Sequence, residues 1–464
     1  MYRRIQRIHF VGIGGIGMCG LAELLQSQGY RVSGTDLREG PTVRRLRELG
    51  VRVEIGHEAR HVQDADVVVF SSAVPPDNPE LRHAEEHKIP VIRRAEMLAE
   101  MMRLKNGIGV AGSHGKTTTT SLVAHVLDAA GLDPTAVIGG RVLGTGTDRE
   151  ATGARLGHGD LLVAEADESD GSFLRLAPVI AVITNIDPEH LDHHGSEAAL
   201  REAFVSFANR IPFWGVAILC FDHPGVQAIL PSLTRRVFTY GFSPQADLVA
   251  YDLAHAGWSV TFRVRRRDEK LGAVELALAG RHNVANAMAA LSVALELDVP
   301  FDVAAGALGA FRGIERRFQL KGEVAGVRVV DDYGHHPAEV RATLAAARAV
   351  HDGRIVVVFQ PHRYTRTRDL LGEFATAFND ADRLLVTDVY GAGEAPIPGA
   401  DAPAMVDAIH AHGHRDVQHA PELAELPGRL VPELEAGDLV ITLGAGSIMQ
   451  LGSELLSALE ERRA

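Results

Sequence analysis

The sequence predicts an α/β protein of three domains. Short apolar runs alternate with helical patterns through the chain, and this alternation is typical of parallel strands joined by covering helices. Glycine-rich turns follow two of these runs, at residues 12–17 and 112–115, as expected where a strand leads into a helix that binds phosphate. The length of 464 residues agrees with roughly three domains.

The composition is that of a globular protein from a reducing compartment. The chain is 46% hydrophobic with a net charge of −13, so large cores can form and no basic face that would bind nucleic acid dominates. Cys19 and Cys220 lie far apart in apolar stretches, which indicates buried thiols and a cytoplasmic location. No signal peptide is visible, and no run approaches the ~20 apolar residues of a membrane span. We therefore expect neither a nucleic-acid nor a membrane partner.

The first predicted domain, residues 1–104, has a Rossmann-like pattern. Residues 12–17 form a glycine turn between a strand and a helix, and Asp36 closes the next strand, as the dinucleotide-binding fingerprint requires. Such a turn seats a diphosphate at a helix N-terminus, so it serves NAD or another nucleoside diphosphate. Strands are expected at 8–11, 31–34, 67–70 and 91–92, and helices near 16–28, 41–49, 78–87 and 94–101.

Ser72 and Ala73 are further candidates for this site. They follow the strand expected at 67–70, at the sheet edge where ligands collect. The Ser72 hydroxyl can bond a base or a sugar, or it can belong to the turn before the next helix. The sequence leaves both roles open.

The second predicted domain, residues 105–312, is organised around a phosphate-binding loop. An apolar strand at 108–111 is followed by Gly112-Ser113-His114-Gly115, and a helix then begins with Lys116 and Thr117. Glycines let backbone N–H groups converge on an anion, and the open first turn of the helix adds partial positive charge. The spacing is tighter than in the common P-loop, but strand, loop and helix together favour a phosphate site over an ordinary turn. We expect Lys116 to reach the β and γ phosphates and the Thr117 hydroxyl to bind Mg²⁺.

An acid and a histidine follow two later strands of this domain. Glu165 lies at the tip of the strand expected at 160–164, where a carboxylate beside a phosphate loop suits a Mg²⁺ ligand. His190 follows the strand expected at 179–184 and reaches the same edge of the sheet. Mg²⁺ prefers oxygen ligands, so a metal role is chemically less usual for His190 than for Glu165.

Zinc is an alternative metal for the histidine cluster. His190, His193 and His194 are close in the sequence, but no cysteine or acid-histidine pair completes a tetrahedral set. The acids that follow Glu165 suit a solvated turn; they are Asp167, Glu168 and Asp170.

The rest of this domain is predicted to contain short strands and a long helix. The helix at 281–297 opens with His282, Asn283 and Asn286 in its first turn. An asparagine can read adenine through N6 and N7, and Asn283 can equally cap the helix. Short strands in antiparallel hairpins are expected before it, at 248–251, 259–264 and 273–278.

The third predicted domain, residues 313–464, is again α/β. Polar clusters follow its strands at 331–337, 360–369 and 388–396, so the carboxyl edge is again the expected working edge. Two phosphate-type sites in separate domains, with polar strand ends in a third, predict closure of domains over two substrates. Strands are expected at 327–330, 355–359, 384–387 and 439–443, and helices near 338–350, 367–379, 402–412 and 447–461.

Taken together, a set of motifs makes the chain similar to the Mur ligase family. In chain order they are GSHGKTTT, EADESD, NIDPEHLD, RHNVANAMAA, GIERRF, DDYGHHPAEV and QPHRYTRTRD. The resemblance covers essentially the whole chain and is closest to the members that add L-alanine. It implies a Rossmann-like N-terminal domain that binds the UDP-sugar, and a central P-loop-type ATPase domain with a small antiparallel portion. It also implies a Rossmann-like C-terminal domain that closes over ATP and the amino acid.

The resemblance also implies the reaction and its partners. The lactoyl carboxylate of UDP-N-acetylmuramate attacks the γ-phosphate of ATP, which gives an acyl phosphate and ADP. The amine of L-alanine then attacks the acyl carbon, and phosphate leaves. ATP is the co-substrate and Mg²⁺ or Mn²⁺ the metal, and a monomer or weak homodimer is expected.

By motif, the resemblance assigns a role to each candidate residue. Catalytic roles fall to Lys116, Glu165, His190, Arg317, His336, His362, Arg363 and Arg366. ATP-binding roles fall to Gly112, Ser113, His114, Gly115, Lys116, Thr117, Thr118, His282, Asn283, Asn286, Arg317 and Asp332. Roles in binding the UDP-sugar or the amino acid fall to Gly15, Ile16, Gly17, Asp36, Ser72, Ala73, Tyr333 and His335. The metal ligands are Thr117, Glu165 and His190.

A lysine that several members of the similar family use to bind a second metal is absent from this chain. Several sister ligases hold a second metal with a carbamylated lysine, but no lysine lies between Lys116 and Lys270, so this chain must place that metal without one.

Within the family, the rival is a ligase that joins a tripeptide to the same sugar in murein recycling. From another class, the rival is an NAD-dependent oxidoreductase, which rests on residues 12–17 and Asp36. The loop at 112–117 disfavours the oxidoreductase, because a dehydrogenase needs no such cradle.

Overall fold

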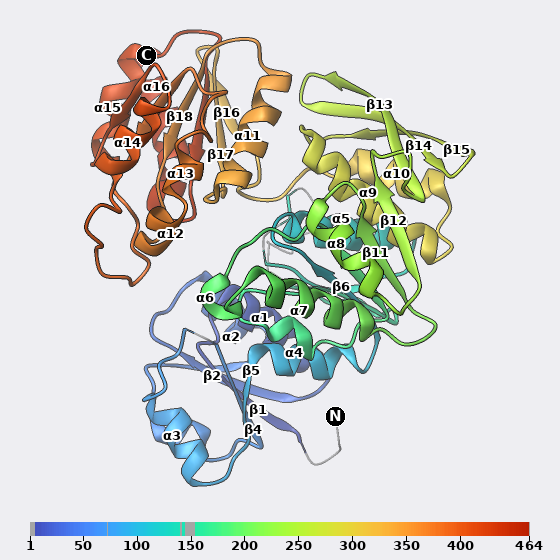
Figure 1. Cartoon of the computed structure of the whole chain (residues 1–464). Helices are drawn as coiled ribbons and strands as arrows, with labels where there is room; N and C mark the ends of the chain where they lie inside the picture. Colours follow the sequence, from blue (N-terminus) through green and yellow to red (C-terminus); the bar gives the residue numbers. More distant parts are fainter. Residues whose placement is uncertain (1–4, 72, 140–141, 144–153, 464) are drawn as a thin grey trace. The chain divides into compact units, whose positions relative to one another are not determined.

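The computed structural model describes residues 5–71, 73–139, 142–143 and 154–463 (Figure 1). Within these residues the chain forms three sheets, of five, ten and six strands, one in each predicted domain. The three-domain α/β architecture is therefore confirmed. Contacts divide the chain into two compact units. The first unit is Met1–Asp252, Phe262–Glu275 and Val284–Arg312, and the second unit is Leu253–Thr261, Leu276–Asn283 and Gly313–Ala464.

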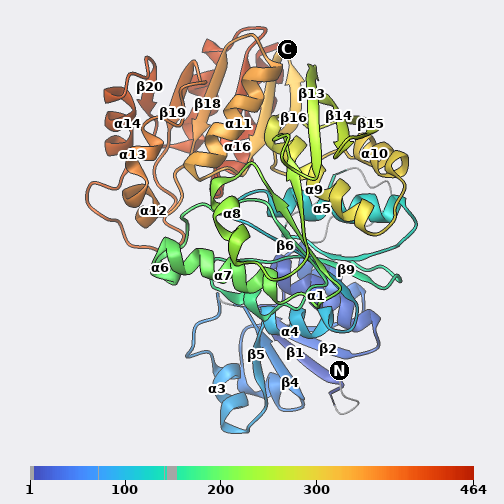
Figure 2. The ribbon, with the colours of Figure 1, turned by 45° about the vertical axis from the view of Figure 1, so that its right-hand side comes forward.

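The first sheet is parallel in all its pairings, in the order β3-β2-β1-β4-β5. Its strands are β1 (Arg7–Val11), β2 (Arg31–Asp36), β3 (Arg52–Ile55), β4 (Val67–Phe70) and β5 (Val91–Arg93), and its helices are α1 (Ile16–Ser27), α2 (Pro41–Glu48), α3 (Pro79–Glu86) and α4 (Arg94–Met102). Helices α1 and α4 lie between this sheet and the central one (Figure 2), and their apolar side chains share a buried core with Phe173 and Phe204 of the central domain. The first sheet is thus anchored to the central domain through these two helices.

The central sheet places the phosphate loop between two strand ends that carry polar residues. Its strand order is β15-β14-β13-β12-β11-β10-β6-β9-β7-β8. Strand β6 pairs in parallel with β9 on one side and β10 on the other, so all three point their carboxyl ends to the same edge. Strands β13, β14 and β15, from the region expected to form hairpins, occupy one end of the order.

The elements of this domain are the following. The strands are β6 (Asn106–Ala111), β7 (Thr135–Val137), β8 (Ala154–Arg155), β9 (Leu161–Glu165), β10 (Ile180–Ile183), β11 (Val216–Cys220), β12 (Val237–Gly241), β13 (Leu248–Ala256), β14 (Ser259–Arg266) and β15 (Glu269–Leu276). The helices are α5 (Lys116–Ala129), α6 (Leu191–His194), α7 (Glu197–Asn209), α8 (Pro224–Ile229), α9 (Arg281–Glu296) and α10 (Phe301–Ala310).

The third sheet runs in the order β16-β17-β21-β18-β19-β20, and only its edge strand β16 is antiparallel to its neighbour. Its strands are β16 (Gln319–Val324), β17 (Val327–Asp332), β18 (Ile355–Phe359), β19 (Arg383–Val386), β20 (Val417–His419) and β21 (Leu439–Leu443). Its helices are α11 (Pro337–Val350), α12 (Tyr364–Asp369), α13 (Leu371–Phe374), α14 (Ala402–Ala411), α15 (Leu426–Leu430) and α16 (Leu451–Arg463). The helix predicted near 367–379 is wrong in extent, because the helical backbone is interrupted at Leu370 (φ −112°) and two short helices form instead.

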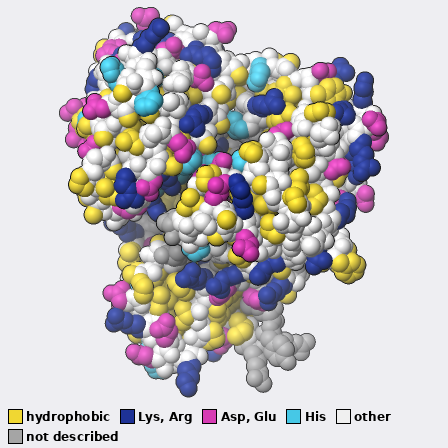
Figure 3. Space-filling model, in the orientation of Figure 1, with side chains coloured by type: hydrophobic (Ala, Val, Ile, Leu, Met, Phe, Trp, Pro, Cys, Tyr) yellow, Lys and Arg dark blue, Asp and Glu magenta, His cyan; other side chains and the backbone are white. Residues whose placement is uncertain are grey.

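The surface carries charges of both signs, and the described helices include none suited to cross a membrane. The face drawn in Figure 3 carries acidic and basic side chains among apolar ones. Among the described residues, no helix has the length and apolar character needed to cross a membrane.

Candidate active site

Two glycines with left-handed backbone shape the phosphate loop. Gly112 has a φ of +133° and Gly115 a φ of +80°. A Cβ at Gly112 would overlap Thr184 Oγ1, and one at Gly115 would lie 2.6 Å from Asn286 Oδ1. The chain can therefore follow this path into the N-terminus of α5 only with glycine at both positions.

His114 ties the loop to the residues after β10. Its N–H donates to Asn185 Oδ1 over 2.7 Å, and its carbonyl accepts from the Thr184 hydroxyl over 2.7 Å. Its ring Nε2 lies 3.1 Å from Asp187 Oδ2 and 2.8 Å from Glu189 Oε1. Both the backbone and the side chain of His114 are thus held, which limits the loop to one conformation.

Asp187 is shared between two histidines. Its second partner is His223, whose Nε2 lies 3.2 Å from Asp187 Oδ1. The Nδ1 of His223 accepts from the backbone N–H groups of Ile186 and Gly225, at 3.3 and 3.2 Å, so the ring proton lies on Nε2 and faces the carboxylate. The hydrogen bonds from His114 and His223 hold the pKa of Asp187 well below its usual range. Asp187 is therefore a charged anchor beneath the loop.

Lys116 is paired with a buried acid. Its Nζ donates to the Gly112 carbonyl over 2.7 Å and to both oxygens of Glu168 over 2.9 Å. The Glu168 side chain is only 1% exposed, so the interpretation of this residue as part of a solvated turn is wrong. Burial by itself lowers the pKa of Lys116, but the charge of Glu168 and its neighbouring acids outweighs burial and raises the pKa. Lys116 is therefore a held ammonium group at the start of α5.

The candidate metal ligands offer two oxygen donors near the loop. Thr117 lies in the first turn of α5, and Glu165 ends β9, with its Cα in register with Val110 of β6. Glu165 Oε1 accepts from the Gly139 N–H over 2.7 Å, which orients the carboxylate. A hydroxyl and a carboxylate beside a phosphate loop suit Mg²⁺.

His190 has a left-handed backbone, with a φ of 54°, and precedes helix α6. Its ring Nε2 lies 3.9 Å from Glu189 Oε2, and its side chain is 31% exposed. The neighbouring His194 donates from Nε2 to the Glu168 carbonyl over 2.9 Å, so it supports the acid that holds Lys116. The described contacts of these histidines are thus with protein groups.

The candidate adenine residues divide between the two units. Asn286 lies against the loop, because its Oδ1 accepts from the Thr119 hydroxyl over 3.1 Å. Asn283 belongs to the second unit, and its Nδ2 donates to the Ala279 carbonyl over 2.7 Å, a contact that is not the N–H-accepting cap of the helix. Burial and the nearby Arg317 lower the pKa of His282, also of the second unit, to about 4.

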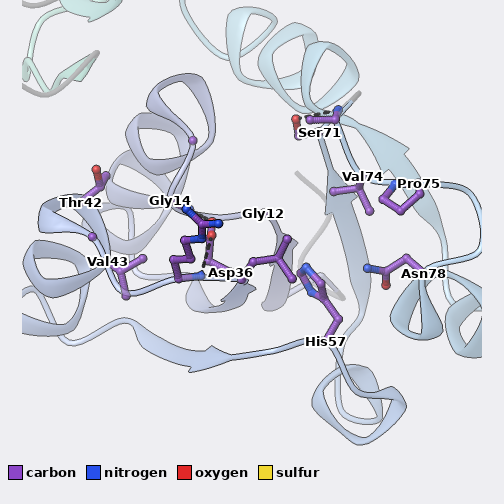
Figure 4. Close-up of a pocket in the computed structure, with 15 residues that line it drawn as sticks. Gly12, Gly14, Asp36, Thr42, Val43, His57, Ser71, Val74, Pro75 and Asn78 are labelled. Carbon is purple, nitrogen blue, oxygen red and sulfur yellow. Dashed lines mark hydrogen bonds between the residues drawn. The ribbon is translucent and has the colours of Figure 1, made fainter. Parts of the chain in front are cut away.

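A cavity of about 520 Å³ lies over the glycine turn of the first domain (Figure 4). Asp36 closes one side of it and accepts from the Gly14 N–H over 2.8 Å. Of the predicted residues, Gly15, Asp36 and Ala73 line the cavity, whereas Gly17 lies within α1 and packs against Arg94. Ile16 begins α1, and Ser72 lies outside the described residues. Prediction missed several lining residues, among them Arg38, His57, Val74 and Asn78.

The second unit brings several predicted residues together at the ends of β17 and β18. The His335 ring lies 5.3 Å from the Tyr333 ring and 5.5 Å from the His362 ring. Arg366 Nη1 lies 3.2 Å from His362 Nδ1 and also donates to the His362 carbonyl. Burial, followed by the charges of His335, Arg366 and Arg363, lowers the pKa of His362 to about 4. Neutral imidazoles and fixed guanidinium groups thus share one sheet edge.

Other predicted residues of this unit have structural partners. Asp332 is buried and accepts from the N–H groups of Phe318 and Gly334, at 2.6 and 2.7 Å. His336 caps α11 by accepting from the Ala338 N–H. The Arg317 guanidinium lies 5.2 Å from the centre of the Tyr333 ring. Arg363 is exposed and has a φ of 71°.

Models of the Mur ligase family match most of the chain. Residues 7–106 match the Mur ligase family catalytic domain, residues 110–294 the Mur ligase middle domain, and residues 316–446 the Mur ligase glutamate ligase domain.

Individual proteins agree with these matches. The chain is 59% identical over 457 residues to the UDP-N-acetylmuramate–L-alanine ligase of Anaeromyxobacter dehalogenans, which covers 98% of each chain. It is also similar to the solved structure of a UDP-N-acetylmuramate-alanine ligase from Thermotoga maritima, with 29% identity, a TM-score of 0.81 and coverage of 98% and 99%. A murein peptide ligase from Psychrobacter arcticus is 26% identical with a TM-score of 0.69, and 98% of each chain is covered. The chain therefore belongs to the Mur ligase family.

Proposed function

We propose that this chain is an ATP-dependent ligase that joins L-alanine to the lactoyl carboxylate of UDP-N-acetylmuramate, a step of peptidoglycan precursor synthesis. The observation that carries this proposal is the phosphate loop with Lys116 at its end, in a chain 59% identical to a ligase of that name. Family membership also argues against the oxidoreductase alternative. We also propose that the domains span residues 1–104, 105–312 and 313–464 and that the protein is cytoplasmic.

The loop and Lys116 are proposed to bind the phosphates of ATP. Helix α5 begins at Lys116 with the free backbone N–H groups of its first turn, and the Lys116 ammonium group lies at the Gly112 carbonyl of the loop; both kinds of group attract anions. Asn286, held by Thr119 against the loop, is proposed to lie near the adenosine. Gly112 and Gly115 let the backbone approach the phosphates closely.

The metal ligands are proposed to be the hydroxyl of Thr117 and the carboxylate of Glu165, with His190 as a third group. Mg²⁺, when bound there, offsets the charge of the phosphates as two anions are brought together. Glu165 is held by Gly139 for this role. Thr117 and Glu165 would thus supply oxygen ligands, and His190 would supply a nitrogen ligand.

In the first chemical step, the sugar carboxylate attacks the γ-phosphorus and ADP leaves. A carboxylate is a poor electrophile, and its phosphorylation creates a leaving group for the second step. The alanine amine then attacks the acyl carbon, and the tetrahedral intermediate expels phosphate. The positive charges of Arg317, Arg363 and Arg366 are proposed to stabilise the charge that develops on phosphate. The neutral imidazoles of His335 and His362 are proposed to line the amino-acid site.

The experiment that tests the function is ADP release with UDP-N-acetylmuramate as the sugar. L-alanine, glycine, L-serine and a tripeptide are compared as acceptors. Turnover with L-alanine but not with the tripeptide supports the proposal, whereas the reverse preference would make the chain a murein-recycling ligase. Lys116→Ala should abolish turnover while UDP binding stays nearly unchanged. Binding of NAD(H) in place of UDP would contradict the proposed function altogether.

A further inference from the structure

His223 lies outside the phosphate loop but shares a carboxylate with it. It comes three residues after β11, and its Nε2 donates to Asp187 Oδ1 over 3.2 Å. The second oxygen of that carboxylate, Oδ2, lies 3.1 Å from Nε2 of His114 in the loop. These three residues follow β11, β10 and β6, which are neighbouring parallel strands of the central sheet. The three side chains thus form a line across the carboxyl edge of the sheet.

The His223 ring performs two separate tasks with its two nitrogens. Nδ1 accepts from the N–H of Gly225 and so caps α8, and it also accepts from the N–H of Ile186. Nε2 therefore carries the proton and donates to Asp187. A Cβ at Gly225 would lie only 2.3 Å from the Ile186 carbonyl oxygen, so the start of α8 and the segment after β10 are closely packed. The ring is anchored by one nitrogen and orients the carboxylate with the other.

Asp187 is attached to the loop through its backbone as well. Its N–H donates to Ser113 Oγ over 2.9 Å, and its carbonyl accepts from the same hydroxyl over 3.3 Å. Two consecutive loop residues, Ser113 and His114, thus contact Asp187. Among the described residues, no side chain other than His223 lies within hydrogen-bonding distance of Asp187 Oδ1. Without that ring, the carboxylate would keep only His114 as a side-chain partner and could turn away from the loop.

We propose that His223 is a positioning residue for ATP, which holds the phosphate loop in its binding conformation through Asp187. This inference rests on the proposed function, in which the loop binds the phosphates of ATP. None of the described hydrogen bonds and ion pairs of His223 reaches residues 112–117, so its effect on the nucleotide must pass through Asp187. A loop that is already held in place binds phosphate without a further cost of ordering.

Two substitutions separate the two tasks of the ring. In His223→Asn, the short amide can reach the place of Nδ1 and cap α8, but it cannot reach Asp187. In His223→Gln, the longer amide can reach the place of Nε2 and donate to Asp187, but the cap is lost. Calorimetry with ADP on the full chain should show affinity about tenfold or more below wild type for His223→Asn. The affinity of His223→Gln should stay within about threefold of wild type.

Stability should follow the opposite order. Urea unfolding should give the wild-type midpoint for His223→Asn and a lower midpoint for His223→Gln, since only the latter loses the cap of α8. The KM for ATP should rise in His223→Asn alone, and the KM for L-alanine should stay unchanged in both variants. A residue that served only the stability of the fold would make the less stable variant the weaker binder.

A further pair of proteins tests the route through Asp187. Asp187→Asn should weaken ADP binding about tenfold or more, because it removes the charge that the two histidines face. The double variant His223→Asn/Asp187→Asn should bind ADP no more weakly than Asp187→Asn does, since both changes break the same link. Losses that add would overturn this route.

The outcomes separate this inference from the proposed function. Wild-type ADP affinity in His223→Asn, or an equal loss of affinity in both His223 variants, would overturn the role of His223. Wild-type ADP affinity in Asp187→Asn would overturn it as well, even if a His223 variant fails to fold. ADP binding by the wild type without ligase turnover would instead contradict the proposed function, and the calorimetric comparison would still decide the role of His223.

Discussion

Lys116 Nζ lies 2.9 Å from both carboxylate oxygens of Glu168. The lysine of the phosphate loop is therefore already paired with an anion of its own domain. Glu168 is held in turn through its carbonyl, which accepts from His194. A nucleotide phosphate that binds Lys116 must therefore compete with the Glu168 carboxylate for the lysine ammonium group.

Removal of Lys116 should cost stability as well as activity. Lys116→Ala leaves the buried carboxylate of Glu168 without its cation, and breaking a buried pair costs about 3–5 kcal/mol. The double variant Lys116→Ala/Glu168→Gln removes the stranded charge, so it should recover most of the stability but no turnover. Urea unfolding and ADP release on the three proteins check both statements. A double variant as unstable as Lys116→Ala would show that the pair is not the source of the loss.

A matched pair of glycine substitutions separates the cost of a left-handed backbone from the effect on the phosphate loop. Gly115 and Gly131 have similar left-handed backbones, with φ of +80° and +76°, but only Gly115 has a neighbour that a Cβ would meet, Asn286 Oδ1 at 2.6 Å. Alanine should cost about 1–2 kcal/mol of backbone strain at either position. Only Gly115→Ala should also weaken ADP binding, by roughly tenfold or more, because the loop must move. Calorimetry with ADP tests this, and an equal effect of Gly131→Ala would contradict it.

Most of the buried parallel strands were predicted, but the buried strand β11 and several edge strands were missed. The runs at 355–359 and 439–443 are continuously apolar, and the structure confirms both as β18 and β21. Strands β3 and β16 were missed because they read RVEI and QLKGEV, with charges on a half-exposed edge. No proline signals the break at Leu370, and Gly372 lies two residues beyond it within α13, so a continuous helix was predicted there.

The loop motif could be recognised from sequence, but its partners could not. Asp187 and His223 are 36 residues apart, and Thr35 and Glu80 are 45 apart, so only the folded sheets bring them together. The sequence indicated acids near Glu165 without showing which one is buried. Strand ends were the useful signal, since Asn185 and Asp187 follow β10 at the predicted edge.

Loss of either oxygen donor should raise the metal concentration needed for turnover. Thr117→Ala and Glu165→Gln each remove one proposed ligand, so half-maximal ADP release should require at least about tenfold more Mg²⁺. Asp170→Asn is the control, because Asp170 accepts from the Ser172 N–H in a turn and has no proposed metal role. A Mg²⁺ titration of the three variants distinguishes them. An unchanged requirement in both ligand variants would exclude this metal site.

The acid limit of stability should depend on Glu80. Burial by itself raises the pKa of this carboxyl, but the His9 ring 3.7 Å away and the hydrogen bonds from Thr35 and His61 outweigh burial and lower the pKa to about 2. A carboxyl with a lowered pKa stabilises the folded state fully above its unfolded pKa, ~4.3, and this contribution is lost as the pH falls towards 2. The wild type should thus lose roughly 3 kcal/mol from this group between about pH 5 and pH 2. Glu80→Gln should be less stable at pH 7 but lose less over that interval, as urea unfolding followed by circular dichroism would measure. Glu54→Gln, which changes an exposed acid, should behave as the wild type does. A Glu80→Gln protein with the full wild-type loss would mean that another group titrates over this range.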